Sequence, residues 1–250
     1  MTTAADLYWR SADLFTAMGS DGDAEALVAA VDAQWPAMSR RAPTPEDAET
    51  CRLTMLAALQ VPELAAEAAV WRARALSRAT VVGWTECVAA LAMGEAFRML
   101  AVANEDFPRG RTLDVIKPVP AAVAALEELS VYLTAPDSGI RLGPMAPTRA
   151  VVERFLHEKG GFLRLVQGDI AGARSSYAAA AQAAAGQPRG EVKVALGAAL
   201  VEYVAGAGDP EPTRQLLPSA EQWPDLATTA RHNVAVMEAG GDDVLGYEIL

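Results

Sequence analysis

Few residues in this 250-residue chain have the types and spacing that catalysis or metal binding requires. The histidines are His157 and His232, and neither has a second histidine, a cysteine or an acid at the spacing of a metal site. Glu153 precedes His157 by about one helical turn, which predicts a surface pair rather than two metal ligands. We therefore expect no metal, no cofactor and no catalytic set, and the sequence favours a protein that is not an enzyme.

Two irregular stretches rich in proline and glycine, 104–120 and 135–147, offer a different chemistry. Long irregular loops in compact domains often act as lids or binding loops. Four cations in these stretches could hold an anionic ligand: Arg109, Arg111, Lys117 and Arg141. If both loops closed over a pocket, the protein would be a helical small-molecule-binding protein or an enzyme, although no nucleophile, base or metal set can be named for it.

Composition excludes several classes of partner. The net charge is −11, and the three lysines and the arginines form no basic run, so we expect no nucleic acid partner. No uncharged stretch approaches the ~18 residues of a membrane span. Cys51 and Cys87 lie in apolar helical sequence and form no disulfide framework. An acid, Asp6, stands where a signal peptide needs basic residues, so we expect a cytoplasmic protein. The high alanine and arginine content is typical of GC-rich bacterial genomes.

The elements that must position any site are predicted to be helices throughout. Helix-forming residues dominate, apolar residues recur at helical spacing, and strand signals are nearly absent. Thr44 is a predicted N-cap, followed by Pro45 at the first helical position. We expect an all-α chain of about twelve helices in antiparallel pairs. The clearest helices are predicted at 3–18, 23–35, 45–59, 84–102, 121–133, 149–167, 170–185, 190–205, 211–220, 225–239 and 242–249, and a further helix is predicted to open at Pro62 with 70–76 as its centre.

The segment 161–181 predicts a helical hairpin with almost no loop. An apolar helix runs into Gly168-Asp169, and alanine-rich helical sequence resumes at once. Gly-Asp returns at Gly208-Asp209 and Gly241-Asp242, after about 40 and then about 33 residues, which is within the range of helix-pair arrays. The chain is expected to be one α-helical domain, 1–250. A sub-boundary at 135–147 would separate an N-terminal helical half, 1–134, from the repeats at 148–250.

These residues resemble the tetratricopeptide repeat, most clearly over residues 149–250. In that family a small residue lies midway along the first helix and a glycine with an acid forms the turn. The second helix then carries a small residue, an aromatic and another small residue. Here the matching residues are Gly161, Gly168-Asp169, Ala173, Tyr177 and Ala180. The resemblance implies helix pairs stacked in a right-handed superhelix, with Tyr177 wedged between neighbouring hairpins.

The resemblance also implies a concave groove that binds a protein or peptide, so the chain would be an adaptor or regulator. The acidic and apolar character of the implied groove favours a basic or apolar segment as the partner. The alternatives are the small-molecule protein described above and a self-assembling, dimeric scaffold subunit. Carried over position by position, the peptide-binding groove would present Phe155, Glu158, Phe162, Glu191, Val194, Ala198, Glu202, Thr229, His232 and Val236.

Overall fold

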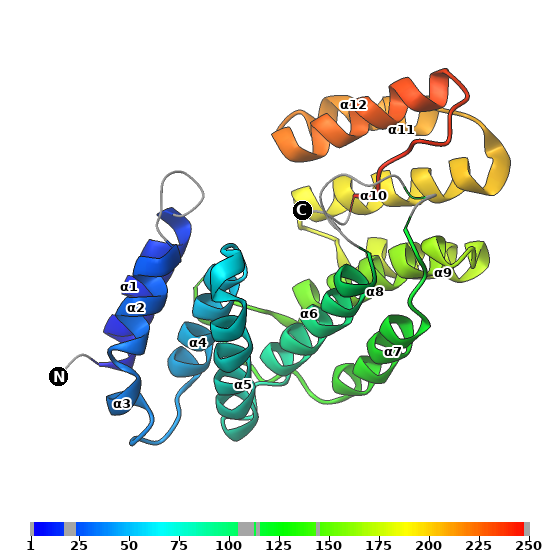
Figure 1. Ribbon diagram of the computed structural model, residues 1–250. Coiled ribbons are helices and arrows are strands. Elements are labelled where there is room, and N and C mark those ends of the chain that lie inside the picture. The colour runs from blue at the N-terminus through cyan, green and yellow to red at the C-terminus, as the bar shows by residue number, and fades with distance from the viewer. Residues whose placement is uncertain (1–2, 18–23, 105–112, 114–115, 144–145, 248–250) are drawn as a thin grey trace. The chain divides into compact units, whose positions relative to one another are not determined.

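The computed structural model is helical, as the sequence predicts (Figure 1). It describes residues 3–17, 24–104, 113, 116–143 and 146–247. Within these residues there are twelve α-helices and no strand beyond a single bridge residue, Leu245. The chain divides into two compact units. Unit 1 comprises Met1–Leu91 and Ala135–Thr148, and unit 2 comprises Ala92–Thr134 and Arg149–Leu250. The division falls within α6 (Thr85–Ala103).

Unit 1 is organised around α4, which packs against α1, α2 and α5. The start of α4 is fixed as predicted. Thr44 Oγ1 accepts a hydrogen bond from Asp47 N, the Asp47 side chain accepts one from Thr44 N, and Pro45 opens the helix. Most of α4 is buried, so it has no wide solvent-facing side. The helices of this unit are α1 (Ala4–Ala17), α2 (Ala24–Asp32), α3 (Trp35–Met38), α4 (Pro45–Ala58) and α5 (Ala65–Val81), with a 3₁₀ turn at Pro62–Leu64 before α5.

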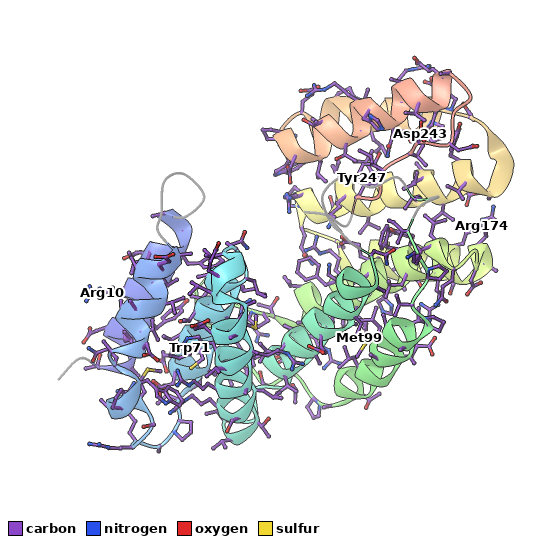
Figure 2. All side chains as sticks on the ribbon, viewed as in Figure 1. Arg10, Trp71, Met99, Arg174, Asp243 and Tyr247 are labelled. Carbon is purple, nitrogen blue, oxygen red and sulfur yellow. The ribbon has the colours of Figure 1, made fainter. Side chains whose placement is uncertain are left out.

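Charged and aromatic side chains fill part of the interior of unit 1. Buried Asp47 forms ion pairs with Arg41 and with Arg78, whose Nη1 lies 3.5 Å from Asp47 Oδ2. The guanidinium of Arg74 lies 4.1 Å from the ring centroid of Trp35 and 4.2 Å from that of Trp71, which is labelled in Figure 2. Cation–π contacts of this kind let an arginine lie against aromatic rings without losing its charge. These interactions tie α3, α4 and α5 together.

The segment 135–148 belongs to unit 1 and is held by side chains that bind its backbone. Ser138 N donates to Glu86 Oε1 at 3.1 Å, and Ser138 Oγ donates to the same carboxylate. Gly143 N donates to the Tyr8 hydroxyl at 2.8 Å. The segment therefore lies against α1 and the first turn of α6.

Unit 2 contains the predicted helical hairpin. Gly168 adopts a positive φ of 78°, and the Asp169 side chain caps the following helix by accepting from Gly172 N at 2.9 Å. Among the helix pairs, α8 and α9 make the most extensive contact. The helices of this unit are the second half of α6, α7 (Pro120–Thr134), α8 (Arg149–Val166), α9 (Ile170–Ala183), α10 (Pro188–Glu202), α11 (Glu211–Ala220) and α12 (Pro224–Glu238).

Tyr177 lies between two hairpins, as the resemblance implies. A Cβ atom built on Gly161 of α8 would lie 2.8 Å from the Tyr177 ring, and one on Gly197 of α10 would lie 2.3 Å from it. Real Cβ atoms do not approach so closely, so both positions require glycine. The aromatic ring thus fills the space that two missing side chains leave open.

The end of unit 2 departs from the predicted helices. After α10 a π-helical turn, Tyr203–Ala207, contains Gly206 at a φ of 93°, and α11 begins after Pro210. The predicted helix 242–249 is wrong over the described residues, because 242–247 is non-helical. In Figure 1 this segment runs back from the end of α12 toward α10. Several of its backbone groups bind other residues of the unit, as described next.

Candidate peptide-binding surface

The predicted groove residues on α10 line a cavity of about 550 Å³ with α9. Its floor and walls are mostly small apolar side chains, and its rim carries an ion pair between Arg174 and Glu202 at 2.6 Å. Glu191 at the opposite end accepts a hydrogen bond from Gly186 N at 2.8 Å. The structure therefore brings four predicted residues together, although with α9 rather than α8: Glu191, Val194, Ala198 and Glu202.

Glu158 was expected on the groove surface, but it lies in the interior. Its side chain is 1% exposed and its Oε1 lies 2.6 Å from Lys193 Nζ, which is equally buried. Arg154 Nη1 is 3.8 Å from the other carboxylate oxygen. The reason is the close approach of α10 to α8, which places Lys193 directly against Glu158. An ion pair this deeply buried cannot offer its charge to a partner.

The other predicted residues of α8 and α12 divide between packing and contact with one segment. Phe155 is half-buried, with the Arg154 guanidinium 4.2 Å from its ring centroid. Thr229 and Val236 are half-buried on α12. Phe162 and His232 are different, because both contact the segment 242–247 that follows α12.

Asn233 is the side chain that holds this segment. Leu245 N donates to Asn233 Oδ1 at 2.7 Å, and Asn233 Nδ2 donates to Leu245 O at 2.8 Å. Both backbone groups of one residue are therefore bound by one amide, as a neighbouring strand would bind them. Asn233 is 0% exposed, so leaving a buried amide group unpaired would cost about 1–3 kcal/mol.

Two more backbone contacts flank this pair of hydrogen bonds. Leu113 N donates to Val244 O at 3.0 Å from the other side of the segment. His232 Nε2 lies 2.9 Å from Asp243 O, and it must carry the proton to donate, because a carbonyl oxygen only accepts. Asp243 is labelled in Figure 2, on the segment that leaves α12. The segment is therefore bound through its main chain over three consecutive residues.

Side chains complete the contact on the inner side. Gly246 lies against Phe162, and a Cβ on Gly246 would lie 2.4 Å from Phe162 Cε2. Tyr247, labelled in Figure 2, is 1% exposed and packs in the apolar core that includes Leu196 and Leu200. Burial raises the pKa of the Tyr247 phenol above its ordinary value, while the neighbouring Asn233 lowers it in part. The tyrosine stays neutral at physiological pH and acts as an apolar anchor with a polar tip.

A second cavity, of about 640 Å³, lies beside the described part of 104–120. Its lining includes Ile116 and Pro118 from that stretch, with Tyr203 and Asp242 as its ionisable residues. Of the four predicted anion-binding cations, Arg109 and Arg111 lie outside the described residues. Lys117 is exposed and does not line this cavity, although its N–H donates to Asn104. Arg141 belongs to unit 1, where it pairs with Asp137 at 2.7 Å. Of the predicted cations that the structure describes, Lys117 therefore lies outside the lining of this cavity and Arg141 lies in the other unit.

The remaining reactive groups are held in structural contacts. Glu153 pairs with Arg149 at 2.6 Å, and burial lowers the pKa of His157. Cys51 and Cys87 are fully buried free thiols, and burial raises the pKa of each to about 12. Among the described residues, no group of three or more metal-ligating side chains is arranged to hold an ion. Across the same residues, every helix is too short or too polar to span a lipid bilayer.

Sequence reasoning missed Asn233 as a site residue, although one signal was present. On α12 the buried positions Leu226, Ala230, Asn233 and Met237 follow the spacing of one helix face. A polar residue in the middle of an apolar face needs a hydrogen-bonding partner. Its partner here is the segment that was predicted to be helical.

Comparisons with known proteins place the chain in no family. No protein-family model matches it, and neither a curated protein nor a solved structure gives a match.

Proposed function

We propose that this protein is a peptide-binding module, in which unit 2 recognises an extended segment of a partner protein. The observation that carries the proposal is the pair of hydrogen bonds between Asn233 and the backbone of Leu245. Recognition through main-chain groups supplies affinity, and pockets beside the main chain supply specificity. Phe162 and the core around Leu196 form the apolar floor on which such pockets depend.

Support for a helix-pair array of the tetratricopeptide kind comes from how α8, α9 and α10 pack. Gly161 and Gly197 contact opposite sides of Tyr177, and Ala173 and Ala180 are fully buried on α9. Close helix pairs with small residues at the contacts give a rigid scaffold, and a rigid scaffold lowers the entropy lost on binding. This arrangement supports an adaptor or regulator that works by equilibrium binding.

The charges of unit 2 favour an apolar rather than a basic partner. Glu202 is paired with Arg174, and Glu158 is paired with Lys193 in the interior. Acids that are already neutralised by neighbours attract a basic segment only weakly. The buried aromatic contacts at Phe162 and Tyr247 indicate instead that apolar anchors provide most of the binding free energy.

Selection from a displayed library of random peptides tests the proposal. The bait is the chain without residues 243–250, so that the Asn233 surface is open. We expect enriched peptides that lose at least about tenfold in affinity when the bait carries Asn233→Ala. Thr228→Ala is the matched control, because Thr228 is exposed on the same helix and donates only to Pro224 O. A folded bait that enriches nothing would contradict the proposed function.

The cavity beside 104–120 favours small-molecule binding as a second candidate. Its volume of about 640 Å³ is within the range of ligand pockets, and Tyr203 and Asp242 are polar groups that could orient a ligand. A thermal-shift screen with small metabolites tests it. A ligand of this cavity should lose its stabilising effect in Val204→Trp, which fills the space.

A further inference from the structure

We infer that residues 243–247 are a built-in ligand, and that the external partner is a peptide of the same chemistry. That peptide would carry an apolar residue whose backbone pairs with Asn233, then a glycine, then a buried aromatic. The inference rests on the proposed function and adds to it a ligand class and a form of self-inhibition.

The first argument is that the segment is bound through its main chain, as a peptide ligand is bound by a protein. Its main chain binds the side chains of His232 and Asn233 on α12, and Val244 O accepts from Leu113 N. These contacts bind the carbonyl oxygens of Asp243, Val244 and Leu245 and the N–H of Leu245, whatever side chains these residues carry. The exposed side chain of Asp243 can therefore vary, as it does where a peptide adds a strand to a protein, whereas the Val244 side chain is 2% exposed and packs in the apolar core.

The second argument is that the next two positions are selective. At Gly246 any side chain would meet the ring of Phe162, whose Cε2 would be 2.4 Å from an added Cβ. Phe162 is 1% exposed, so it is held among its neighbours and cannot easily move away. Tyr247 then places a whole aromatic ring in the core with Leu196 and Leu200. The surface therefore selects glycine followed by an aromatic.

The third argument concerns the connection to α12. The segment leaves the helix through Gly240, at a φ of 68°, and Gly241, whose carbonyl accepts from the Tyr203 hydroxyl at 2.9 Å. The positive φ of Gly240 permits the sharp change of direction that returns the chain to its own helix. A ligand tethered so closely has a millimolar effective concentration or higher. It will exclude an external peptide of moderate affinity until it is released.

The test uses a fluorescent peptide with the sequence of residues 243–250, DVLGYEIL, and fluorescence anisotropy. We expect the chain lacking 243–250 to bind this peptide at least tenfold more tightly than the intact chain does. The same peptide with Gly246→Val should bind the shortened chain at least tenfold more weakly, whereas Asp243→Ala, which changes an exposed side chain, should change binding less than threefold. Asn233→Ala in the shortened chain should also weaken binding at least tenfold.

A second variant guards against a shortened chain that fails to fold, which circular dichroism would reveal. In the intact chain, Gly246→Val should expel the segment from Phe162 and thereby raise affinity for the wild-type peptide at least fivefold. Equal binding by the intact chain, the shortened chain and this variant would overturn the inference. An intact chain that forms dimers only when 243–250 is present would also overturn it, because the segment would then serve a second copy.

The two proposals can fail separately. If the shortened chain enriches library peptides through Asn233 but does not bind DVLGYEIL, the built-in ligand is wrong and peptide binding stands. If a folded shortened chain does neither, peptide binding at this surface is wrong as well.

Discussion

Each unit holds an irregular segment against its helices, and the two use different chemistry. In unit 1 the Glu86 carboxylate accepts from both the N–H and the hydroxyl of Ser138. In unit 2 the Asn233 amide both donates to and accepts from the backbone of Leu245. The carboxylate depends on one serine side chain, whereas the amide matches the main chain of any residue except proline at this position. The contact in unit 1 is therefore specific for the loop that carries Ser138. The contact in unit 2 could in principle be made by the backbone of another peptide, as proposed above.

The interiors of the units share one kind of contact and differ in another. Each unit buries an ion pair, Asp47 with Arg78 in unit 1 and Glu158 with Lys193 in unit 2. Unit 2 in addition brings α8 and α10 together on Tyr177 through two glycines. Such close helix contacts depend on the absence of side chains at the glycines. The comparison predicts that unit 2 is sensitive to added side chains at these positions as well as to the loss of a buried charge.

The largest effect is expected in unit 1. Asp47→Ala leaves buried Arg78 without its carboxylate, so we expect the free energy of unfolding of that unit to fall by about 3–5 kcal/mol. Asp32→Ala is the control, because it removes an exposed carboxylate from Arg74 and should cost at most about 1 kcal/mol. Urea unfolding followed by circular dichroism measures both. Similar losses in the two variants would show that the buried pair has no special role.

The next effect concerns the glycine contacts of unit 2. Gly197→Val forces a side chain into the Tyr177 ring, and overpacking of this kind typically costs about 1–3 kcal/mol. Thermal unfolding measures the loss. Gly94→Ala, at an exposed helical position with open space around it, should instead be neutral or stabilising by up to about 1 kcal/mol. A Gly197→Val chain as stable as wild type would contradict the proposed wedge role of Tyr177.

A paired experiment compares the two segments directly. We expect Asn233→Ala to speed amide hydrogen exchange over 242–247 by about tenfold or more, because the segment loses two backbone hydrogen bonds. Glu86→Gln should speed exchange over 135–143 by less, since a glutamine oxygen still accepts one hydrogen bond from Ser138. Mass spectrometry of peptic fragments gives both rates. A larger increase over 135–143 than over 242–247 would contradict the expectation that the segment in unit 2 depends more on its single side-chain contact.

The smallest effect is a pH dependence from His157. Burial lowers the pKa of this histidine in the folded chain, so the unfolded chain takes up the proton first as the pH falls. The contribution to stability is complete above the unfolded pKa and is lost as the pH falls through the folded pKa. Between about pH 7.5 and pH 5.5, His157→Gln should therefore lose less stability than wild type. Urea unfolding at the two pH values measures both losses of stability. Equal losses in wild type and His157→Gln would show that a group other than His157 causes the pH dependence.

The sequence predicted local features well, because their causes are local. The Thr44 cap, the Gly168-Asp169 turn and the helix-by-helix pattern depend on residues within a few positions of one another. The wedge position of Tyr177 was also predicted, because the tetratricopeptide resemblance links Gly161 to Tyr177 at a fixed offset. Such relations can be seen in a linear sequence.

What the sequence did not predict depends on contacts between distant residues. The segment 242–247 follows a Gly-Asp pair like the one before α9, which favoured a helix, but it contacts Asn233, Leu113 and Phe162 in a non-helical conformation. Glu158 was predicted to lie on the surface, but it is buried because Lys193 of the next hairpin pairs with it. Tertiary contacts of this kind override local propensity, and no spacing rule encodes them.

The ion pair between Glu158 and Lys193 has a consequence for how α8 and α10 find their alignment. Sliding one helix past the other by a single turn, about 5.4 Å, would part the two charges inside an apolar interior. Two solitary ions there would cost far more than the apolar contacts could restore. Folded states in which α8 and α10 are shifted along their axes are thereby disfavoured, and one alignment of the two helices is selected.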